Sequence, residues 1–156
     1  MSELCKYRSL RINLIVLVFV QMLTTLSVYQ LQFFLKYLQG DIYYNTYAYA
    51  IAGMVGSIGG GSVLACLGLR KLFLYGFILA SIGSLLLSIF SQSEGKDNLT
   101  AAMLFVTIFG FAMGFLGCYM SSVLLFPTVL KSSAMGFYNF FARIGGIIAP
   151  FVAELE

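Results

Sequence analysis

Long apolar runs separated by short polar segments dominate this chain. A membrane-spanning helix needs about 20 mostly apolar residues, and five runs reach that length. They cover residues of about 12–35, 46–67, 72–90, 99–125 and 134–153. Because the intervening segments are short, the pattern predicts an all-α integral membrane protein, with one transmembrane domain of five helices over residues 1–156.

The composition agrees with a chain whose main surroundings are membrane lipid. Hydrophobic residues make up 60% of the sequence, charged residues only 10%, and the mean hydropathy is +0.94. A soluble domain carries roughly a quarter charged residues, so the composition excludes that class. The net charge of +3 is too small to indicate a nucleic-acid partner.

The basic residues predict the orientation of the spans. Three segments on one predicted side carry them: Lys6, Arg8 and Arg11 before the first span, Arg70 and Lys71 between the second and third, and Lys131 between the fourth and fifth. The other side has only Lys36 and Lys96. By the positive-inside rule, we expect the N-terminus on the cytoplasmic side, or on the matrix side of a mitochondrial membrane. Which membrane holds the chain stays open.

The first span has a polar face. Gln21, Thr25 and Gln32 recur at spacings of four and seven, which places them along one side of a helix. Exposure of such a polar face to lipid costs free energy. The pattern therefore predicts either hydrogen bonds between helices or the lining of a water-filled cavity, in which Gln21 and Thr25 are candidate solute-binding residues.

Glycine is concentrated in two other spans. The second span contains Gly53, Gly56, Gly59, Gly60 and Gly61, and the fourth contains Gly110, Gly114 and Gly117. Small residues at spacings of three or four let helix backbones approach closely in lipid. The spacing predicts tight packing of these helices, and movement of the helices against one another is the alternative interpretation.

An arginine interrupts the apolar, glycine-rich fifth span. Ionisable groups inside a bilayer are costly and are usually retained for a substrate, an ion or a partner charge. Asn139 lies four residues before Arg143 and shares its helix face, and Tyr119 in the fourth span is a further polar candidate. No acidic residue lies deep in any span, so we expect a solute or a partner chain to supply the counter-charge.

Two linkers carry a family resemblance. Between the second and third spans stand Gly68, Arg70 and Lys71, and between the fourth and fifth stand Pro127 and Lys131. With Phe126 and Thr128 they match loop motifs of the major facilitator superfamily, although Ala65 and Leu124 replace residues that are usually acidic or amide there. The chain resembles helices seven to eleven, in the C-terminal half, of the branch that carries organic cations and anions.

The resemblance implies a function and a set of site residues. It implies transport of small organic solutes, and the position of Arg143 is basic in the family's anion carriers, so organic anions are expected. The predicted solute-binding residues are Arg143, Asn139, Gln21, Thr25 and Tyr119. The predicted gating motif comprises Gly68, Arg70, Lys71, Pro127 and Lys131.

The resemblance covers less than a whole transporter. Major facilitator carriers have two six-helix halves with the solute site between them, so a functional carrier would need another membrane chain to supply the missing half. The alternatives are a degenerate half that serves as an accessory subunit of a larger membrane complex, and an incomplete product without a function of its own. An enzyme is not expected, because the chain has no histidine and no acids converge in the membrane. No cofactor and no metal are expected either.

Overall fold

The computed structural model describes residues 8–36, 42–90 and 97–153, and within these ranges it consists of five long α-helices. They are α2 (Arg8–Phe34), α3 (Ile42–Leu67), α4 (Leu69–Phe90), α5 (Asp97–Leu125) and α6 (Thr128–Ala153). Each helix is long and apolar enough to cross a membrane. The protein is therefore an all-α, multi-pass membrane protein, and the prediction of five spanning helices is confirmed.

All five helices start before the apolar runs that predicted them. Helix α3 begins at Ile42, where the run begins near Thr46, because the intervening tyrosines continue the helix. Helix α6 begins at Thr128, directly after Pro127, and not near Ala134. A proline is well tolerated just before the first turn of a helix, where its missing N–H would have no partner in any case.

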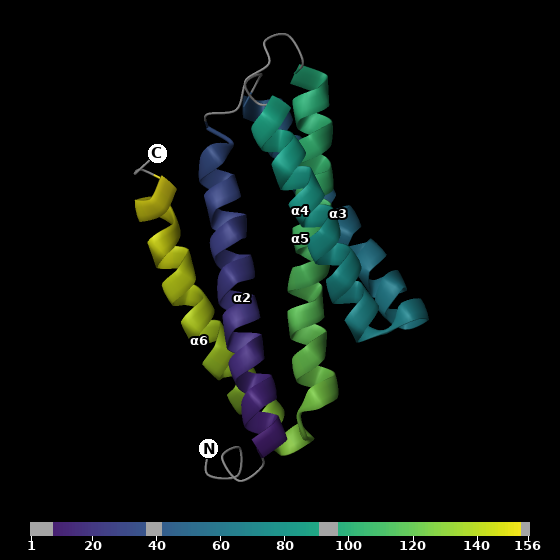
Figure 1. The fold of residues 1–156 in the computed structure, drawn as a ribbon, viewed down its shortest axis with the longest axis vertical. Coiled ribbons are helices and arrows are strands. Elements are labelled where there is room, and N and C mark those ends of the chain that lie inside the picture. The colour runs from purple at the N-terminus through teal and green to yellow at the C-terminus, as the bar shows by residue number, and fades with distance from the viewer. Residues whose placement is uncertain (1–7, 37–41, 91–96, 154–156) are drawn as a thin grey trace. The chain divides into compact units, whose positions relative to one another are not determined.

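The helices form two compact units, and α2 and α5 contribute to both. The first unit contains α2 as far as Gln30, the end of α5 from Cys118, and α6. The second contains the end of α2 from Leu31, all of α3 and α4, and α5 as far as Gly117. Figure 1 shows the course of the five helices.

In the second unit, glycines bring α3 and α4 against α5. A Cβ added at Gly110 of α5 would lie only 2.5 Å from the Ala80 backbone nitrogen and 2.7 Å from the Gly76 carbonyl oxygen of α4. One added at Gly56 of α3 would lie 2.9 Å from the Phe109 carbonyl oxygen. At both positions the added Cβ would meet backbone atoms of the neighbouring helix, so Gly56 and Gly110 let their helices pack closely.

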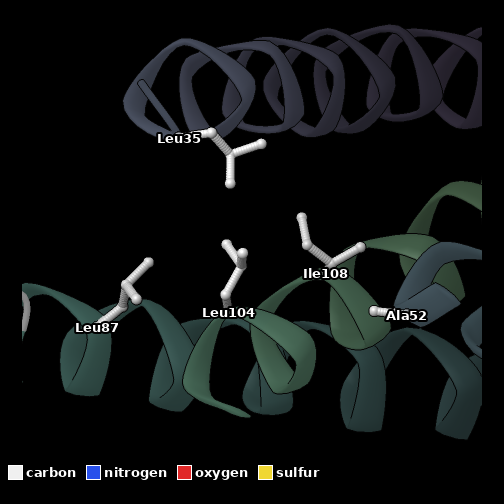
Figure 2. Close-up of a cluster of buried hydrophobic side chains, with 5 residues drawn as sticks. All are labelled: Leu35, Ala52, Leu87, Leu104 and Ile108. Carbon is white, nitrogen blue, oxygen red and sulfur yellow. The ribbon is translucent and has the colours of Figure 1, made fainter. Parts of the chain in front are cut away.

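An apolar cluster closes the same unit near one end. Its buried members are Leu35, Ala52, Leu87, Leu104 and Ile108. Figure 2 shows Leu35, just beyond α2, pointing toward Leu104 and Ile108 of α5. Because these side chains come from four separate segments, the cluster ties the end of α2 to α3, α4 and α5.

In the first unit α6 runs beside α2 (Figure 1). Leu17 of α2, Phe126 and Ala134 form a buried apolar cluster. Further along the pair, a Cβ added at Gly145 would lie 3.0 Å from both the side chain and the carbonyl oxygen of Met22. Gly145 therefore permits a close approach of the two backbones in the part of α6 that carries Arg143.

The basic residues used to predict orientation are exposed where the structure describes them. Arg11, Lys36, Arg70 and Lys71 all have exposed side chains, and Lys131 is half-buried. Lys6 and Lys96 lie outside the described residues, and the side chain of Arg8 is not described either. The chain is an integral membrane protein, and the cytoplasmic or matrix position of its N-terminus stays a prediction.

Candidate functional site

Arg143 lies on the outward side of α6. The buried face of this helix repeats at spacings of three and four residues and comprises Ala134, Tyr138, Ala142, Gly145 and Ala149. Arg143 falls outside that repeat and its side chain is exposed. No hydrogen bond or ion pair to Arg143 occurs within the part of the chain that the structure describes. The charge of Arg143 is thus exposed within a membrane-spanning segment.

Asn139 stands one helical turn before Arg143 and is half-buried. The hydroxyl of Tyr119 in α5 donates a hydrogen bond to Asn139 Oδ1 over 3.3 Å. Two of the five predicted solute-binding residues are therefore in direct contact. A shift of one helix against the other would break this contact, so the pair also fixes the register of α5 and α6.

Tyr119 belongs to a small polar cluster that α6 shares with the end of α5. The ring of Tyr138 meets that of Tyr119 edge-on at 6.3 Å between centroids. The Tyr138 hydroxyl donates to Ser122 Oγ over 3.4 Å, and Ser122 in turn donates to the Tyr119 carbonyl oxygen over 2.7 Å. Tyr138 and Ser122 are both fully buried, so this side of the cluster belongs to the packed interior of the unit.

Gln21 and Thr25 lie inside the first unit. Their side chains are 1% and 7% exposed, and neither Gln21 Oε1 nor Thr25 Oγ1 has a hydrogen-bond partner among the described residues. Thr24, their neighbour, instead donates to the Val20 carbonyl oxygen of its own helix. Two unpartnered oxygens one turn apart are unusual, because buried polar groups are nearly always hydrogen-bonded.

The pair Gly145 and Gly146 brings α6 close to this polar face. A Cβ at Gly146 would lie 3.8 Å from Thr25 Cγ2 and 3.0 Å from the ring of Tyr29. Thr25 therefore lies against α6 three residues beyond Arg143. Sequence reasoning missed this contact. The adjacent glycines in an apolar span were its signal, because they remove the side chains that would hold two helices apart.

The first predicted gating linker is a single residue that joins two helices. Gly68 has a φ of +80°, which favours glycine because it has no Cβ. Its N–H donates to the Leu64 carbonyl oxygen over 3.1 Å, and its own carbonyl accepts from the Leu72 N–H over 3.2 Å. Gly68 thus ends α3 and starts α4. Arg70 and Lys71 follow with exposed side chains.

The second predicted gating linker joins α5 to α6. The carbonyl oxygen of Pro127 accepts from the N–H groups of Leu130 and Lys131 over 2.9 and 3.0 Å, and this starts α6. Phe126 is buried against Leu17 and Ala134, while Pro127 itself is exposed. The two linkers lie in different units, and each has a local role in ending or starting a helix.

Metal binding has no support in the described ranges. They contain no group of three histidine, cysteine, aspartate or glutamate side chains that could hold an ion. The polar groups in the first unit are instead amides, hydroxyls and one guanidinium. Such groups bind polar organic molecules by hydrogen bonds and charge.

This arrangement belongs to a multi-pass helical membrane protein. Its described spans contain an unpaired basic group and buried polar groups without hydrogen-bond partners. No family model matches the chain. Its sequence is 24% identical to solute carrier family 22 member 4 of Mus musculus over 157 aligned residues, which cover 98% of this chain and 27% of that protein.

Two other relatives give the same result. Solute carrier family 22 member 15 of Xenopus tropicalis is 29% identical over 94% of this chain and 29% of its own length. Solute carrier family 22 member 7 of Mus musculus is 32% identical over 56% of this chain and 16% of its own length. All three relatives are solute carriers of family 22. The resemblance drawn from the sequence, to the organic cation and anion branch of the major facilitator superfamily, is confirmed.

The chain spans under a third of the length of the relatives that align with nearly all of it. Their names denote carriers and not enzymes, which agrees with the expectation that this chain has no enzymatic activity.

Proposed function

We propose that this chain forms part of a transmembrane carrier for small organic solutes, and that the solutes are anions. The observation that carries the proposal is Arg143. Its guanidinium is exposed on a membrane-spanning helix and has no partner in the described part of the chain. A charge in that position costs about 3 kcal/mol at the centre of a bilayer, so a ligand that neutralises it is favoured.

The charge pattern supports an anionic ligand. The five spanning segments contain no aspartate or glutamate, so the spans themselves offer Arg143 no internal ion pair. A guanidinium binds carboxylate or sulfonate groups through two parallel hydrogen bonds. Asn139, one turn away, adds an amide that can donate to the same group.

Gln21 and Thr25 support a polar solute pathway in the same unit. Each buries an oxygen that has no partner among the described residues, and each such oxygen costs about 1–3 kcal/mol while it stays unsatisfied. A solute or a water molecule that donates hydrogen bonds would recover that free energy. We propose that these two residues bind the uncharged polar part of the solute.

This chain corresponds to under a third of the length of its relatives, so the proposed carrier requires further membrane helices. We propose that they come from the same polypeptide or from a partner membrane chain, with the N-terminus of this chain on the cytoplasmic or matrix side. In this proposal Gly68, Arg70, Lys71, Pro127 and Lys131 form the inner linkers through which the helices change position during transport.

The proposal is tested by uptake into proteoliposomes that contain this chain purified together with the membrane helices that complete the carrier. Benzenesulfonate and phenyltrimethylammonium are suitable probes, because they share an aromatic ring, carry fixed opposite charges and cross lipid slowly. We expect uptake of benzenesulfonate to exceed that of the cation. Arg143→Ala should abolish this uptake, while Arg11→Ala, which removes an exposed arginine at the start of α2, should retain it.

Two other outcomes would reject the proposal. Equal uptake by wild type and Arg143→Ala would show that Arg143 does not belong to the solute pathway. Lower yield of the assembled protein in Arg143→Ala, with no uptake in the wild type, would favour the accessory role, in which a carboxylate of a partner chain pairs with Arg143.

A further inference from the structure

The hydrogen bond between Tyr119 and Asn139 has a consequence for the type of ligand that α6 accepts. A side-chain amide carries one acceptor oxygen and one NH₂ group that donates two hydrogen bonds. Tyr119 occupies the oxygen of Asn139. The amide nitrogen has no partner among the described residues, so both N–H donors of Asn139 remain for a ligand, whereas one of the two lone pairs of its oxygen is already used.

Arg143 has the same hydrogen-bonding character. A guanidinium has five N–H donors and no acceptor, and Arg143 follows Asn139 by one helical turn. The two side chains together therefore present mainly donors. A ligand group that accepts hydrogen bonds and carries negative charge fits such a pair, and a cation fits neither member.

We propose that Tyr119 is a positioning residue that sets charge selectivity by fixing the orientation of the Asn139 amide. This inference rests on the proposed function. Tyr119 does not need to touch the solute: its hydroxyl holds Oδ1 and so turns the NH₂ group of Asn139 outward. Without the hydroxyl, the amide can rotate by half a turn and present its oxygen, which a cation can bind.

Tyr138 provides a matched control within the same cluster. Its ring lies edge-on to that of Tyr119, and its hydroxyl also donates one hydrogen bond, but the acceptor is Ser122 Oγ and not Asn139. Tyr119→Phe and Tyr138→Phe each remove one oxygen atom from neighbouring rings. Only the first frees the Asn139 amide.

The test measures equilibrium binding of benzenesulfonate and phenyltrimethylammonium to the full chain in lipid nanodiscs. We expect Tyr119→Phe to raise the dissociation constant for the anion about fivefold, as loss of one oriented hydrogen bond predicts, and to narrow the preference for anion over cation. Tyr138→Phe should keep the wild-type preference even if it lowers thermal stability.

A double-mutant cycle separates positioning from direct contact. In Asn139→Leu there is no amide to orient, so we expect Tyr119→Phe to cause no further change in that background. Asn139→Leu alone should also weaken anion binding, which keeps the inference testable if Tyr119→Phe does not assemble.

Failure of the inference and failure of the proposed function give different results. If Tyr119→Phe keeps the wild-type preference for the anion, Tyr119 does not position Asn139. The same conclusion follows if both tyrosine variants shift this preference equally. An effect of Tyr119→Phe that persists in Asn139→Leu would overturn the inference in the same way. If the wild-type chain shows no preference for the anion, the proposed function is wrong and the inference is wrong with it.

Discussion

Arg143 shows how one residue can be interpreted from sequence and where that interpretation stops. Its place in an apolar span and the absence of acids from the spans are visible in the sequence alone. Its exposure depends on the rotation of α6, which is set by Tyr138, Ala142 and Gly145 on the buried face. The contact of Asn139 with Tyr119 could not be predicted either, because it depends on the register of two helices.

Arg143→Lys keeps the charge and removes the fork of parallel donors. We expect about tenfold weaker binding of benzenesulfonate, because lysine binds an anion as a point charge and one charge-assisted hydrogen bond is lost. Isothermal titration of the purified variant in nanodiscs would measure this change. Wild-type affinity in Arg143→Lys would show that the site needs charge but not the guanidinium geometry.

The elements pack through glycines, and the sequence predicted this for the second and fourth spans. It did not predict the close approaches at Gly76 of α4 and Gly145 of α6. It could not predict which glycine faces a neighbour. A Cβ added at Gly110 would lie within 3 Å of the backbone of α4, whereas one added at Gly61 would find no atom within 4 Å. The clustered glycines of the second span look alike in the sequence, so only the packed structure separates contact positions from exposed ones.

Gly110→Ala and Gly61→Ala test this difference between contact and exposure. A Cβ at Gly110 collides with backbone atoms of Ala80 and Gly76, which cannot move aside as a side chain can. We expect overpacking to lower the thermal unfolding midpoint by about 5 °C. Gly61→Ala should leave the midpoint unchanged or raise it slightly, because alanine favours helix. Equal midpoints for the two variants would contradict the packing of α4 on α5.

Gly68→Ala tests the single-residue connection between α3 and α4. Alanine at a φ of +80° costs about 1–2 kcal/mol, although the space beside Gly68 is open within 4 Å. We therefore expect Gly68→Ala to lower the unfolding midpoint through backbone strain alone. Gly68→Asn should lower the midpoint less, because asparagine tolerates this conformation. A midpoint for Gly68→Ala equal to that of wild type would show that α3 and α4 are joined in another way.

At the scale of the whole molecule, five spanning helices follow from the lengths of the apolar runs, since a bilayer fixes how long such a run must be. The division of the chain into two units does not follow from them. Helices α2 and α5 each contribute to both units. The division depends on the position along each helix at which its packing partners change. No periodicity in the sequence marks Gln30 or Cys118 as such a point.

The orientation of the chain is tested by cysteine labelling. Tyr43 at the start of α3 and Ser132 near the start of α6 are both exposed, and five alternating spans place them on opposite sides. In a background with Cys5, Cys66 and Cys118 replaced, an impermeant maleimide is added to sealed native membranes on the side opposite the cytoplasm or matrix. We expect it to label Tyr43→Cys and not Ser132→Cys. Labelling of both from one side would contradict the five-span topology.

The claim that Arg143 selects an anion is tested most directly by reversing its charge. Arg143→Glu replaces the donors with a carboxylate on the same exposed side of α6, and Arg11→Glu makes the same change at the exposed start of α2. Binding of benzenesulfonate and phenyltrimethylammonium is compared for both variants in nanodiscs. We predict that Arg143→Glu binds the cation in preference to the anion and that Arg11→Glu keeps the wild-type preference. A preference for the anion that survives Arg143→Glu would contradict the claim.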